Sequence, residues 1–322
     1  MKLLAVIVNY RTPDLTLRAA EAALGELSAF PGSQIALVDN DSGDGSLGAL
    51  REAVEAAGGP ARAKVLESPR NGGFAWGVNF AVRPALAGPA PPDLVYLLNS
   101  DARPGPGSIV ELVRFLETHP RVGIAGSYIH GPDGETHHTA FRFPSIASEF
   151  EQMAGIGALS RLLDRWIVSK PVPSEATRVD WLAGASMMIR REVFEAVGAF
   201  DENFFLYFEE TDFCLQAARA GWPTWYVPAS RVEHIGAAST GWKDFSRPRP
   251  AFWFDGRRYY FAKNFGHAGL WAANAAWITG AVLGRIWSAV LRKQRRRPAR
   301  LFRDFLRYNL SFRPIGQRLP RP

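Results

Sequence analysis

Apolar runs alternate with Ala- and Leu-rich stretches in the first hundred residues. The runs are Leu3–Val8, Ile35–Val38 and Leu94–Leu98. Each run is continuous, which is typical of strands that are covered on both faces. The stretches between the runs have the length of helices, and strand–helix–strand repeats at this spacing indicate βαβ units. We therefore predict an α/β protein with a mostly parallel sheet flanked by helices.

Polar residues follow each run at the predicted carboxyl end of the strand. Asn9 follows the first run, Asp39 the second, and Asn99-Ser100-Asp101 the third. Because the carboxyl ends of parallel strands lie along one edge of a sheet, these side chains are expected to face a shared crevice. A carboxylate such as Asp101 can hold a hard divalent cation, which in turn can hold a diphosphate. Taken singly, Asp101 could instead cap its loop, and Asp39 could belong to a plain turn.

A glycine-rich segment, Asn71 to Asn79, precedes the third run. Gly72 and Gly73 permit close approach of the backbone to a ligand, and Asn79 is expected on the helix that follows. The segment differs from the G-x-G-x-x-G dinucleotide motif and from the G-x-x-x-x-G-K-[ST] phosphate motif. It is therefore a candidate ligand loop of another kind.

Two adjacent carboxylates, Glu209 and Glu210, follow an aromatic-rich run and open a predicted helix. A helix N-terminus stabilises acidic side chains, so these residues and Asp212 could be ordinary first-turn acids. The functional interpretation is a general base, which must come within about 3 Å of the proton that it removes.

Histidines offer a second set of candidates. His234 follows a predicted strand and could be structural or a metal ligand. His137 and His138 are adjacent, but the sequence places no matching set of ligands at the usual spacing around them.

Taken together, these motifs resemble the family 2 glycosyltransferases of the GT-A fold, and rhamnosyltransferase-like members are the most similar. The motifs occur in the family's order, as Val6–Tyr10, Val38–Asn40, Asn71–Asn79 and Asn99–Asp101. The resemblance implies a Rossmann-like catalytic domain over residues 1–240 and a separate C-terminal helical region over residues 241–322.

In that family the first two motifs hold the base and ribose of a nucleotide sugar, and the strand-end D-x-D-like motif binds the metal and the diphosphate. The resemblance therefore implies Mg²⁺ or Mn²⁺ at Asp101, with His234 as a second ligand. Asn99 stands in place of the first Asp and becomes a nucleotide contact. The other implied donor contacts are Asn9, Asp39, Asn71, Gly72 and Asn79.

The family's E-D-x-D pattern is matched by Glu209–Asp212, and its second acid is the base of an inverting transfer. Glu210 is thus the implied base, with a side chain one methylene longer than the usual Asp. Residues 179–189 are predicted to form one strand, which in the family lies beneath the donor sugar and the acceptor; a plain core strand is the alternative. The implied sugar and acceptor pocket consists of Trp181, Gly184, Ala185 and Glu209.

Composition bounds the compartment and the partners. The single Cys214 excludes an internal disulfide and fits a reducing compartment. Six apolar residues before Asn9 are too few for a signal-peptide core, so we expect the protein on the cytoplasmic side. The net charge of +7 is unevenly distributed. Twelve Lys/Arg and one acid lie from Arg285 onward, which gives this segment a charge of +11, whereas residues 1–284 have a charge of −4. A basic arm of this kind binds nucleic acid or an anionic membrane face.

The uncharged run Ala268–Gly284 has seventeen residues, which is short for a membrane span of about 20. We expect an interfacial or re-entrant helix, with Trp271, Trp277 and Trp287 at the depth of the lipid headgroups. Basic residues follow at 292–297, and residues 300–310 are predicted to form a basic amphipathic helix suited to an anionic leaflet. A solvated tail or a subunit contact is the alternative.

The sequence therefore predicts an inverting, metal-dependent glycosyltransferase at the cytoplasmic face of the cell membrane. Its donor would be a dTDP- or UDP-sugar, with rhamnose from dTDP-rhamnose as the named candidate. Its acceptor would be a lipid-linked or cell-surface glycan of cell-wall or polysaccharide biosynthesis. Two other hypotheses stay open: a nucleic-acid-binding protein that uses the basic arm, which the acidic body disfavours, and a catalytically inactive nucleotide-sugar-binding protein. Homo-oligomer formation is also left open.

Overall fold

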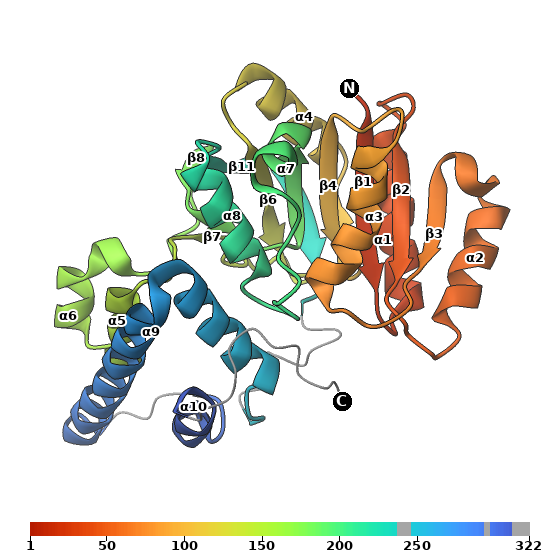
Figure 1. Cartoon of the computed structure of the whole chain (residues 1–322). Coiled ribbons are helices and arrows are strands. Elements are labelled where there is room, and N and C mark those ends of the chain that lie inside the picture. Colours follow the sequence, from red (N-terminus) through yellow and green to blue (C-terminus); the bar gives the residue numbers. More distant parts are fainter. Residues whose placement is uncertain (237–245, 293–296, 311–322) are drawn as a thin grey trace. The chain divides into compact units, whose positions relative to one another are not determined.

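The computed structural model describes residues 1–236, 246–292 and 297–310, which form two compact units (Figure 1). The first unit takes residues 1–141, 171–205 and 209–236 of the described chain. The second takes 142–170, 206–208, 246–292 and 297–310. The boundary predicted between residues 240 and 241, most of the predicted basic segment 292–297 and the chain after 310 lie outside the described residues.

A nine-stranded sheet forms the centre of the first unit, in the order β3-β2-β1-β4-β10-β6-β11-β5, with β8 beside β11. Strands β1, β2, β3, β4, β6 and β11 run in one direction, whereas β10, β5 and β8 are antiparallel to their neighbours. The mostly parallel sheet is therefore confirmed. Its strands are β1 Leu3–Asn9, β2 Gln34–Asp39, β3 Ala63–Glu67, β4 Leu94–Asn99, β5 Ala102–Pro104, β6 Ile124–His130, β8 Thr177–Val179, β10 Ser186–Arg190 and β11 Thr224–His234.

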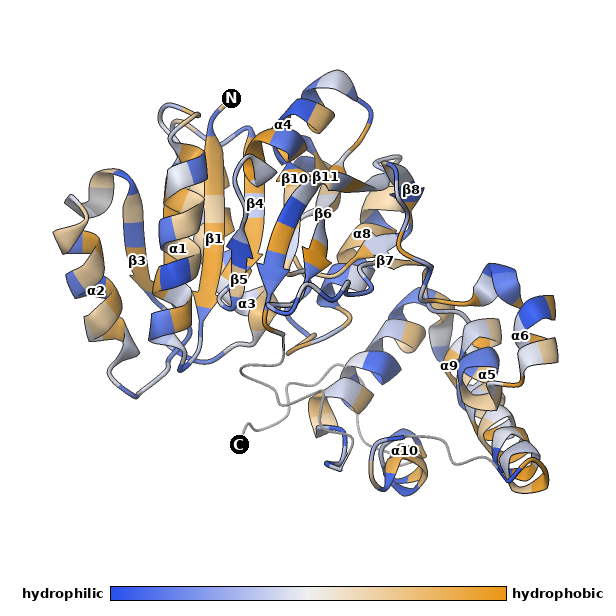
Figure 2. Cartoon of the chain, turned by 180° about the vertical axis from the view of Figure 1, so that it is seen from behind, coloured by the Kyte–Doolittle hydropathy of each residue, from blue (hydrophilic) through white to orange (hydrophobic). Residues whose placement is uncertain are grey.

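Helices cover both faces of this sheet. Helices α1, α2 and α4 pack on one face, and α3, α7 and α8 pack near the other. Their bounds are α1 Pro13–Leu27, α2 Ser46–Ala56, α3 Phe74–Ala87, α4 Ser108–Thr118, α7 Arg191–Val197 and α8 Glu209–Arg219, with a short 3-10 helix η1 at Gly59–Ala61. Figure 2 shows hydrophobic residues concentrated along the central strands β1 and β4. Burial on both faces explains why the sequence of these strands is continuously apolar.

The strand predicted over residues 179–189 is interrupted, and this prediction was wrong. The chain forms β8, then β9 (Trp181–Leu182), and only then β10. Strand β9 leaves the main sheet and pairs with β7 (Ala140–Phe141). The break spans Ala183–Ala185, where small residues at the end of the short strand let the backbone change course. These residues lie in the candidate active site.

The second unit is helical. Its elements are α5 Ile146–Ala154, α6 Gly157–Leu162, η2 Asp164–Trp166, α9 Ala251–Val290 and α10 Leu301–Asn309. Helix α9 is broken at Gly266, whose φ of 71° is left-handed, so two helical halves meet there. The helical insertion between the strands of the first unit, residues 142–170, packs with α9 rather than with the sheet.

A buried arginine joins the helices of this unit. Arg257 is fully buried and forms an ion pair with Glu149 of α5 at 2.7 Å. Its Nη1 also donates to the amide oxygens of Asn274, at 2.8 Å, and Asn309, at 2.9 Å. These contacts connect α5, both halves of α9 and α10, and they explain the polar Asn274 within the uncharged run. A buried guanidinium requires such partners, since an unpaired charge there would be costly.

Two sequence predictions for this region were wrong in part. Trp277, expected at headgroup depth, is 2% exposed and stacks on Phe305 of α10 with ring centroids 3.6 Å apart. The amphipathic helix predicted over 300–310 is formed as α10, but its apolar face, including the fully buried Phe305, packs against α9. Both side chains complete the core of the unit because α10 folds back onto α9. Trp271 and Trp287 are exposed. Within the described chain, no helix has the length and apolar character needed to cross a membrane.

Candidate active site

The carboxyl ends of β1 and β2 meet in a buried hydrogen-bond cluster. Asn9 donates from Nδ2 to Oδ1 of Asp39 at 2.8 Å and to Oγ of Ser42 at 3.1 Å. Its Oδ1 accepts a hydrogen bond of 2.8 Å from Thr16. Ser42 in turn donates from Oγ to Asp39 at 2.6 Å. The structure thus brings Asn9 and Asp39 together, as the strand-end argument predicts, and fixes the orientation of the Asp39 carboxylate.

The glycine-rich loop approaches two neighbouring groups so closely that only glycine fits at Gly72 and Gly73. Gly73 has a φ of 83°, and a Cβ there would lie 1.9 Å from the carbonyl oxygen of Phe205. A Cβ on Gly72 would lie 1.9 Å from Cγ of Trp76. Oδ1 of Asn71 accepts a hydrogen bond of 3.0 Å from the N–H of Gly73, which fixes the turn. The loop therefore connects the strand edge to the segment that leads into α8.

Asn79 has a use in the structure that the sequence did not suggest. It is 1% exposed on α3, and its Oδ1 accepts from the N–H of Phe200 at 3.0 Å. Its Nδ2 donates to the carbonyl oxygen of Phe200 at 2.8 Å and to Glu202 at 3.0 Å. Both ends of the amide are thus engaged by the chain before α8. The structure does not bring its side chain into the Asn9–Asp39 cluster.

Asp101 and His234 are in direct contact. Oδ1 of Asp101 lies 3.0 Å from Nε2 of His234, and Nδ2 of Asn99 lies 3.5 Å from the same nitrogen. The contact results from antiparallel pairing of β5 with the end of β11, which places His234 opposite Ala102. The side chains are only partly exposed, at 10% for Asp101 and 18% for His234. The ring of His137 lies edge-on to that of His234, with centroids 6.2 Å apart.

This donor set suits a divalent cation. A carboxylate oxygen and an imidazole nitrogen are ligands that Mn²⁺ accepts, and a carboxylate with water or phosphate oxygens suits Mg²⁺. No group of three or more His, Cys, Asp or Glu side chains that could enclose a metal occurs in the described chain. The pair Asp101 and His234 would therefore leave coordination positions open to ligands that are not protein side chains.

Glu209 and Glu210 begin α8 in a desolvated position. Glu209 is 3% exposed, and Glu210 is half-buried with its Oε2 below the surface. Burial raises the pKa of Glu210 to about 7. Burial, and then the adjacent Glu210 carboxylate, raise the pKa of Glu209 well above its usual range. With a pKa of about 7, Glu210 can exchange a proton at neutral pH, as a general base requires.

The small residues before β10 connect this acidic pair to the strand end. The backbone of Gly184 faces the Glu210 carboxylate and keeps its pKa below the value that burial alone would give. The carbonyl oxygen of Ala185, the next residue, accepts from the N–H of Asn99 at 3.1 Å. Gly184 and Ala185 thus lie between Glu210 and the end of β4 at Asn99, two residues before Asp101.

Trp181 stands at the edge of the same segment. Its ring stacks on Phe141 of β7 with centroids 4.2 Å apart and an interplanar angle of 18°. One face of the indole is therefore covered by protein. Trp181 remains partly exposed, as a side chain that stacks on a sugar ring would be.

Two residues that shape the site, Ser42 and Phe141, were not predicted from the sequence. Ser42 follows Asp39 in an Asp-Asn-Asp-Ser-Gly turn, and this pattern typically forms side-chain-to-backbone bonds that could have indicated it. Phe141 carries no local signal, because its role depends on the pairing of β7 with β9.

The fold is similar to that of two solved glycosyltransferases. GalNAc-T7 with UDP, GalNAc and Mn²⁺ has a TM-score of 0.58 and 17% identity, over 83% of this chain and 51% of that chain. The mannosyltransferase PcManGT from Pyrobaculum calidifontis, with GDP-Man and Mn²⁺, has a TM-score of 0.52 and 16% identity, over 96% and 84%. At these identities the likeness shows the fold alone. The fold is the GT-A fold of glycosyltransferases.

The sequence comparisons identify the family. A profile described as "Glycosyltransferase like family 2" matches residues 2–250, and the chain belongs to this family. The N-acetylglucosaminyl-diphospho-decaprenol L-rhamnosyltransferase of Mycobacterium tuberculosis (strain ATCC 25618 / H37Rv) is 30% identical over 316 residues, 92% of this chain and 96% of the relative. The protein is therefore a family 2 glycosyltransferase that resembles rhamnosyltransferases, as the sequence motifs predicted.

Proposed function

We propose that the protein transfers a sugar, with inversion at C1, from a nucleotide diphosphate to a lipid-linked glycan. The mycobacterial relative is named as an L-rhamnosyltransferase of N-acetylglucosaminyl-diphospho-decaprenol. Its name supports rhamnose, from dTDP-rhamnose, as the sugar and a lipid-linked acceptor in cell-wall or polysaccharide synthesis. Both similar solved structures hold Mn²⁺ with a nucleotide, which supports Mn²⁺ or Mg²⁺ as the cofactor.

The donor would bind along the carboxyl edge of the sheet. Asn9 and Asp39 would receive the base and ribose, since their fixed side chains line this edge. The loop with Asn71 and Gly72 would admit the donor close to the backbone, and Asn99 would contact the nucleotide. Asn79 would contribute by holding the segment 200–202 in place.

Asp101 and His234 would hold the cation beside the diphosphate. Their separation of 3.0 Å and partial exposure fit a site that phosphate oxygens complete. When bound, the cation supplies positive charge to the departing nucleotide diphosphate. Asp101 and His234 would thereby hold the diphosphate on the side of C1 opposite the attacking hydroxyl of the acceptor.

Glu210 would act as the base. Its carboxylate takes the proton of an acceptor hydroxyl as that oxygen forms the new bond to C1 of the donor sugar. The bond between C1 and the diphosphate oxygen breaks, and its electron pair leaves with the nucleotide diphosphate. One displacement of this kind inverts the configuration at C1. The sugar and acceptor would lie against Trp181, Gly184, Ala185 and Glu209.

The observation that carries this proposal is the connection through Gly184 and Ala185. Gly184 faces the carboxyl group of Glu210, whose pKa is about 7. Ala185 accepts a hydrogen bond from Asn99 at the end of β4, two residues before the proposed cation ligand Asp101. A base beside a cation site is the arrangement that glycosyl transfer from a nucleotide diphosphate needs.

The test is binding of UDP-, GDP- and dTDP-sugars with and without Mn²⁺. We expect one nucleotide class to bind more tightly with Mn²⁺, and Asp101→Ala to abolish that gain. Glu117→Ala, which removes an exposed carboxylate from α4, serves as the control and should behave as the wild type. A folded wild-type protein that shows no metal-dependent nucleotide binding would overturn the proposal.

We also propose contact of the second unit with the cytoplasmic membrane surface. The last turns of α9 expose large apolar side chains, with exposed fractions from 39% to 69%: Val282, Leu283, Ile286, Trp287 and Val290. Such a surface can enter the headgroup region of a bilayer. Ile286→Ser should weaken binding to phosphatidylglycerol vesicles, whereas Leu162→Ser, at a 76% exposed position of α6, should not. Equal binding by both variants and the wild type would contradict this contact.

A further inference from the structure

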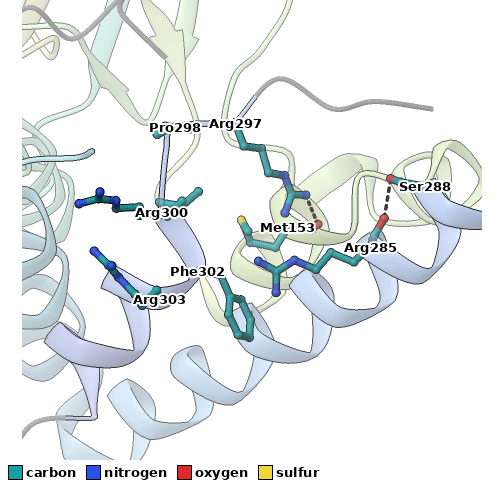
Figure 3. Close-up of a pocket in the computed structure, with 10 residues that line it drawn as sticks. Met153, Arg285, Ser288, Arg297, Pro298, Arg300, Phe302 and Arg303 are labelled. Carbon is teal, nitrogen blue, oxygen red and sulfur yellow. Dashed lines mark hydrogen bonds between the residues drawn. The ribbon is translucent and has the colours of Figure 1, made fainter. Parts of the chain in front are cut away.

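A basic cavity lies within the second unit, and all the residues that line it belong to that unit. Its volume is about 470 Å³, within the usual range for small-molecule sites. Figure 3 shows its lining: Met153 from α5, Arg285 and Ser288 from the last turns of α9, and the chain from Arg297 into the start of α10. Nothing in the transfer reaction proposed above uses these residues.

The lining is strongly cationic. Among the described residues that line the cavity, Arg285, Arg297, Arg300 and Arg303 are arginines and none is acidic. Arg303 lies 3.0 Å from the Asp304 carboxylate, outside the lining, so its charge is partly balanced. Arg285 and Arg300 form no ion pair with any described residue. The cavity therefore has an excess of positive charge.

Two of these arginines are held in place by contacts within the second unit. The Arg285 guanidinium lies over the ring of Phe302, 4.0 Å from its centroid, and this stacking restricts its rotation. Arg297 donates from Nη2 to the carbonyl oxygen of Met153 at 2.6 Å. A guanidinium held in this way loses less freedom when it binds an oxyanion in bidentate geometry.

The start of α10 adds to the same field. Arg300 is the N-cap residue, with a left-handed φ of 57° and no side-chain capping bond. Leu301, Phe302 and Arg303, the first three helical residues, all line the cavity. Helix N-termini present free N–H groups and partial positive charge. The N-terminus of α10 therefore adds to the positive potential that the arginine side chains create in the cavity.

We propose that this cavity binds a phosphate or diphosphate group, and that Arg285 and Arg300 are its principal ligands. Planar guanidinium groups match the geometry of phosphate oxygens, and the cavity accepts a group of this size. The phosphate could belong to an anionic lipid headgroup or to a soluble compound. The inference does not depend on the proposed transfer reaction, because the site and its ligands lie wholly in the second unit.

The first experiment is titration of inorganic pyrophosphate into the full-length protein in metal-free buffer, followed by calorimetry. We expect saturable binding, weakened about tenfold or more in the double variant Arg285→Gln/Arg300→Gln because two charge-assisted contacts are lost. The matched control Arg161→Gln/Arg307→Gln removes two exposed arginines of the same unit that do not line the cavity, and it should bind as the wild type does. Asp101→Ala should also leave this binding unchanged, which separates it from the nucleotide site.

The second experiment identifies the source of the phosphate. Cosedimentation with phosphatidylglycerol vesicles, at constant ionic strength, is compared with and without pyrophosphate. If pyrophosphate competes and the Arg285→Gln/Arg300→Gln variant loses both ligands, the cavity takes a lipid headgroup. If the variant loses only pyrophosphate, the cavity takes a soluble phosphate compound. The proposal is overturned if the wild type shows no saturable pyrophosphate binding, or if the two double variants lose it equally.

Discussion

Oδ1 of Asp101 lies 3.0 Å from Nε2 of His234, although 133 residues separate them in the chain. The three-residue strand β5 brings them together, because it follows Asp101 directly and pairs antiparallel with the end of β11. A cation at this position would link the edge of the sheet built by the first hundred residues to its last strand. The proposed transfer reaction depends on this pairing.

Loss of the imidazole should weaken cation binding. We expect His234→Ala to lower the affinity for Mn²⁺, measured by electron paramagnetic resonance with nucleotide present, by about tenfold or more, since a nitrogen ligand is removed. His267→Ala, at an exposed position of the second unit, is the control. Unchanged Mn²⁺ affinity in His234→Ala would show that His234 is structural.

Removal of the proposed base should reduce turnover without affecting donor binding. Glu210→Gln preserves size but cannot accept a proton, so kcat should fall by about 10²- to 10⁴-fold. Because burial raises the pKa of Glu210 to about 7, wild-type activity should fall as the pH is lowered through 7. A steady-state pH profile tests both points. A variant that retains activity within a few-fold of the wild type would assign the base elsewhere.

The same buried carboxyl group should make folding stability depend on pH. The folded pKa of Glu210, about 7, lies above its ordinary value of 4.5, so the folded state binds the proton more tightly. The stability contributed by this group is present below pH 4.5 and is lost as the pH rises through 7. The change in the free energy of unfolding caused by Glu210→Gln should therefore be more favourable at pH 8 than at pH 4.5, by roughly 1–3 kcal/mol.

Denaturant unfolding at the two pH values measures this difference. Glu117→Gln, at an exposed position, should show none. A Glu210→Gln effect that is independent of pH would mean that the carboxyl group is not desolvated in the folded protein.

The glycine-rich loop offers a test of backbone geometry. Gly73→Ala places a Cβ at a φ of 83° and against the carbonyl oxygen of Phe205, so we expect a loss of about 2–4 kcal/mol in stability together with weaker donor binding. Gly48→Ala in α2 meets no atom within 4 Å and should be neutral or slightly stabilising. Equal thermal melting of the two variants would show that the loop adapts.

Much of the catalytic unit could be predicted from the sequence, because its signals are local. Continuous apolar runs indicated buried strands, and the residue after each run marked the carboxyl edge of the sheet, so Asn9 and Asp39 were correctly predicted to lie together. The start of α8 at Glu209 was also predictable from the acids and aromatic residues around it. These features follow from periodicity and chain polarity, which neighbouring residues determine.

Other features depended on contacts between distant segments. The sequence of α10 is amphipathic in either environment, and only its packing on α9 decides that Phe305 covers Trp277 instead of lipid. The amide of Asn79 was assigned to a nucleotide, but the fold brings Phe200 within its reach.

Amphipathic patterns and polar residue types thus determined which surfaces this chain must cover and where its ligand-binding edge lies. The tertiary structure decided what covers each surface and which charged side chains have no ion-pair partner among the described residues. Burial is a property of the whole fold. The pKa of Glu210 reaches about 7 only when helices from separate parts of the chain exclude water from its carboxyl group. Likewise, only the fold places Arg285 and Arg300 in a cavity where no described residue forms an ion pair with them.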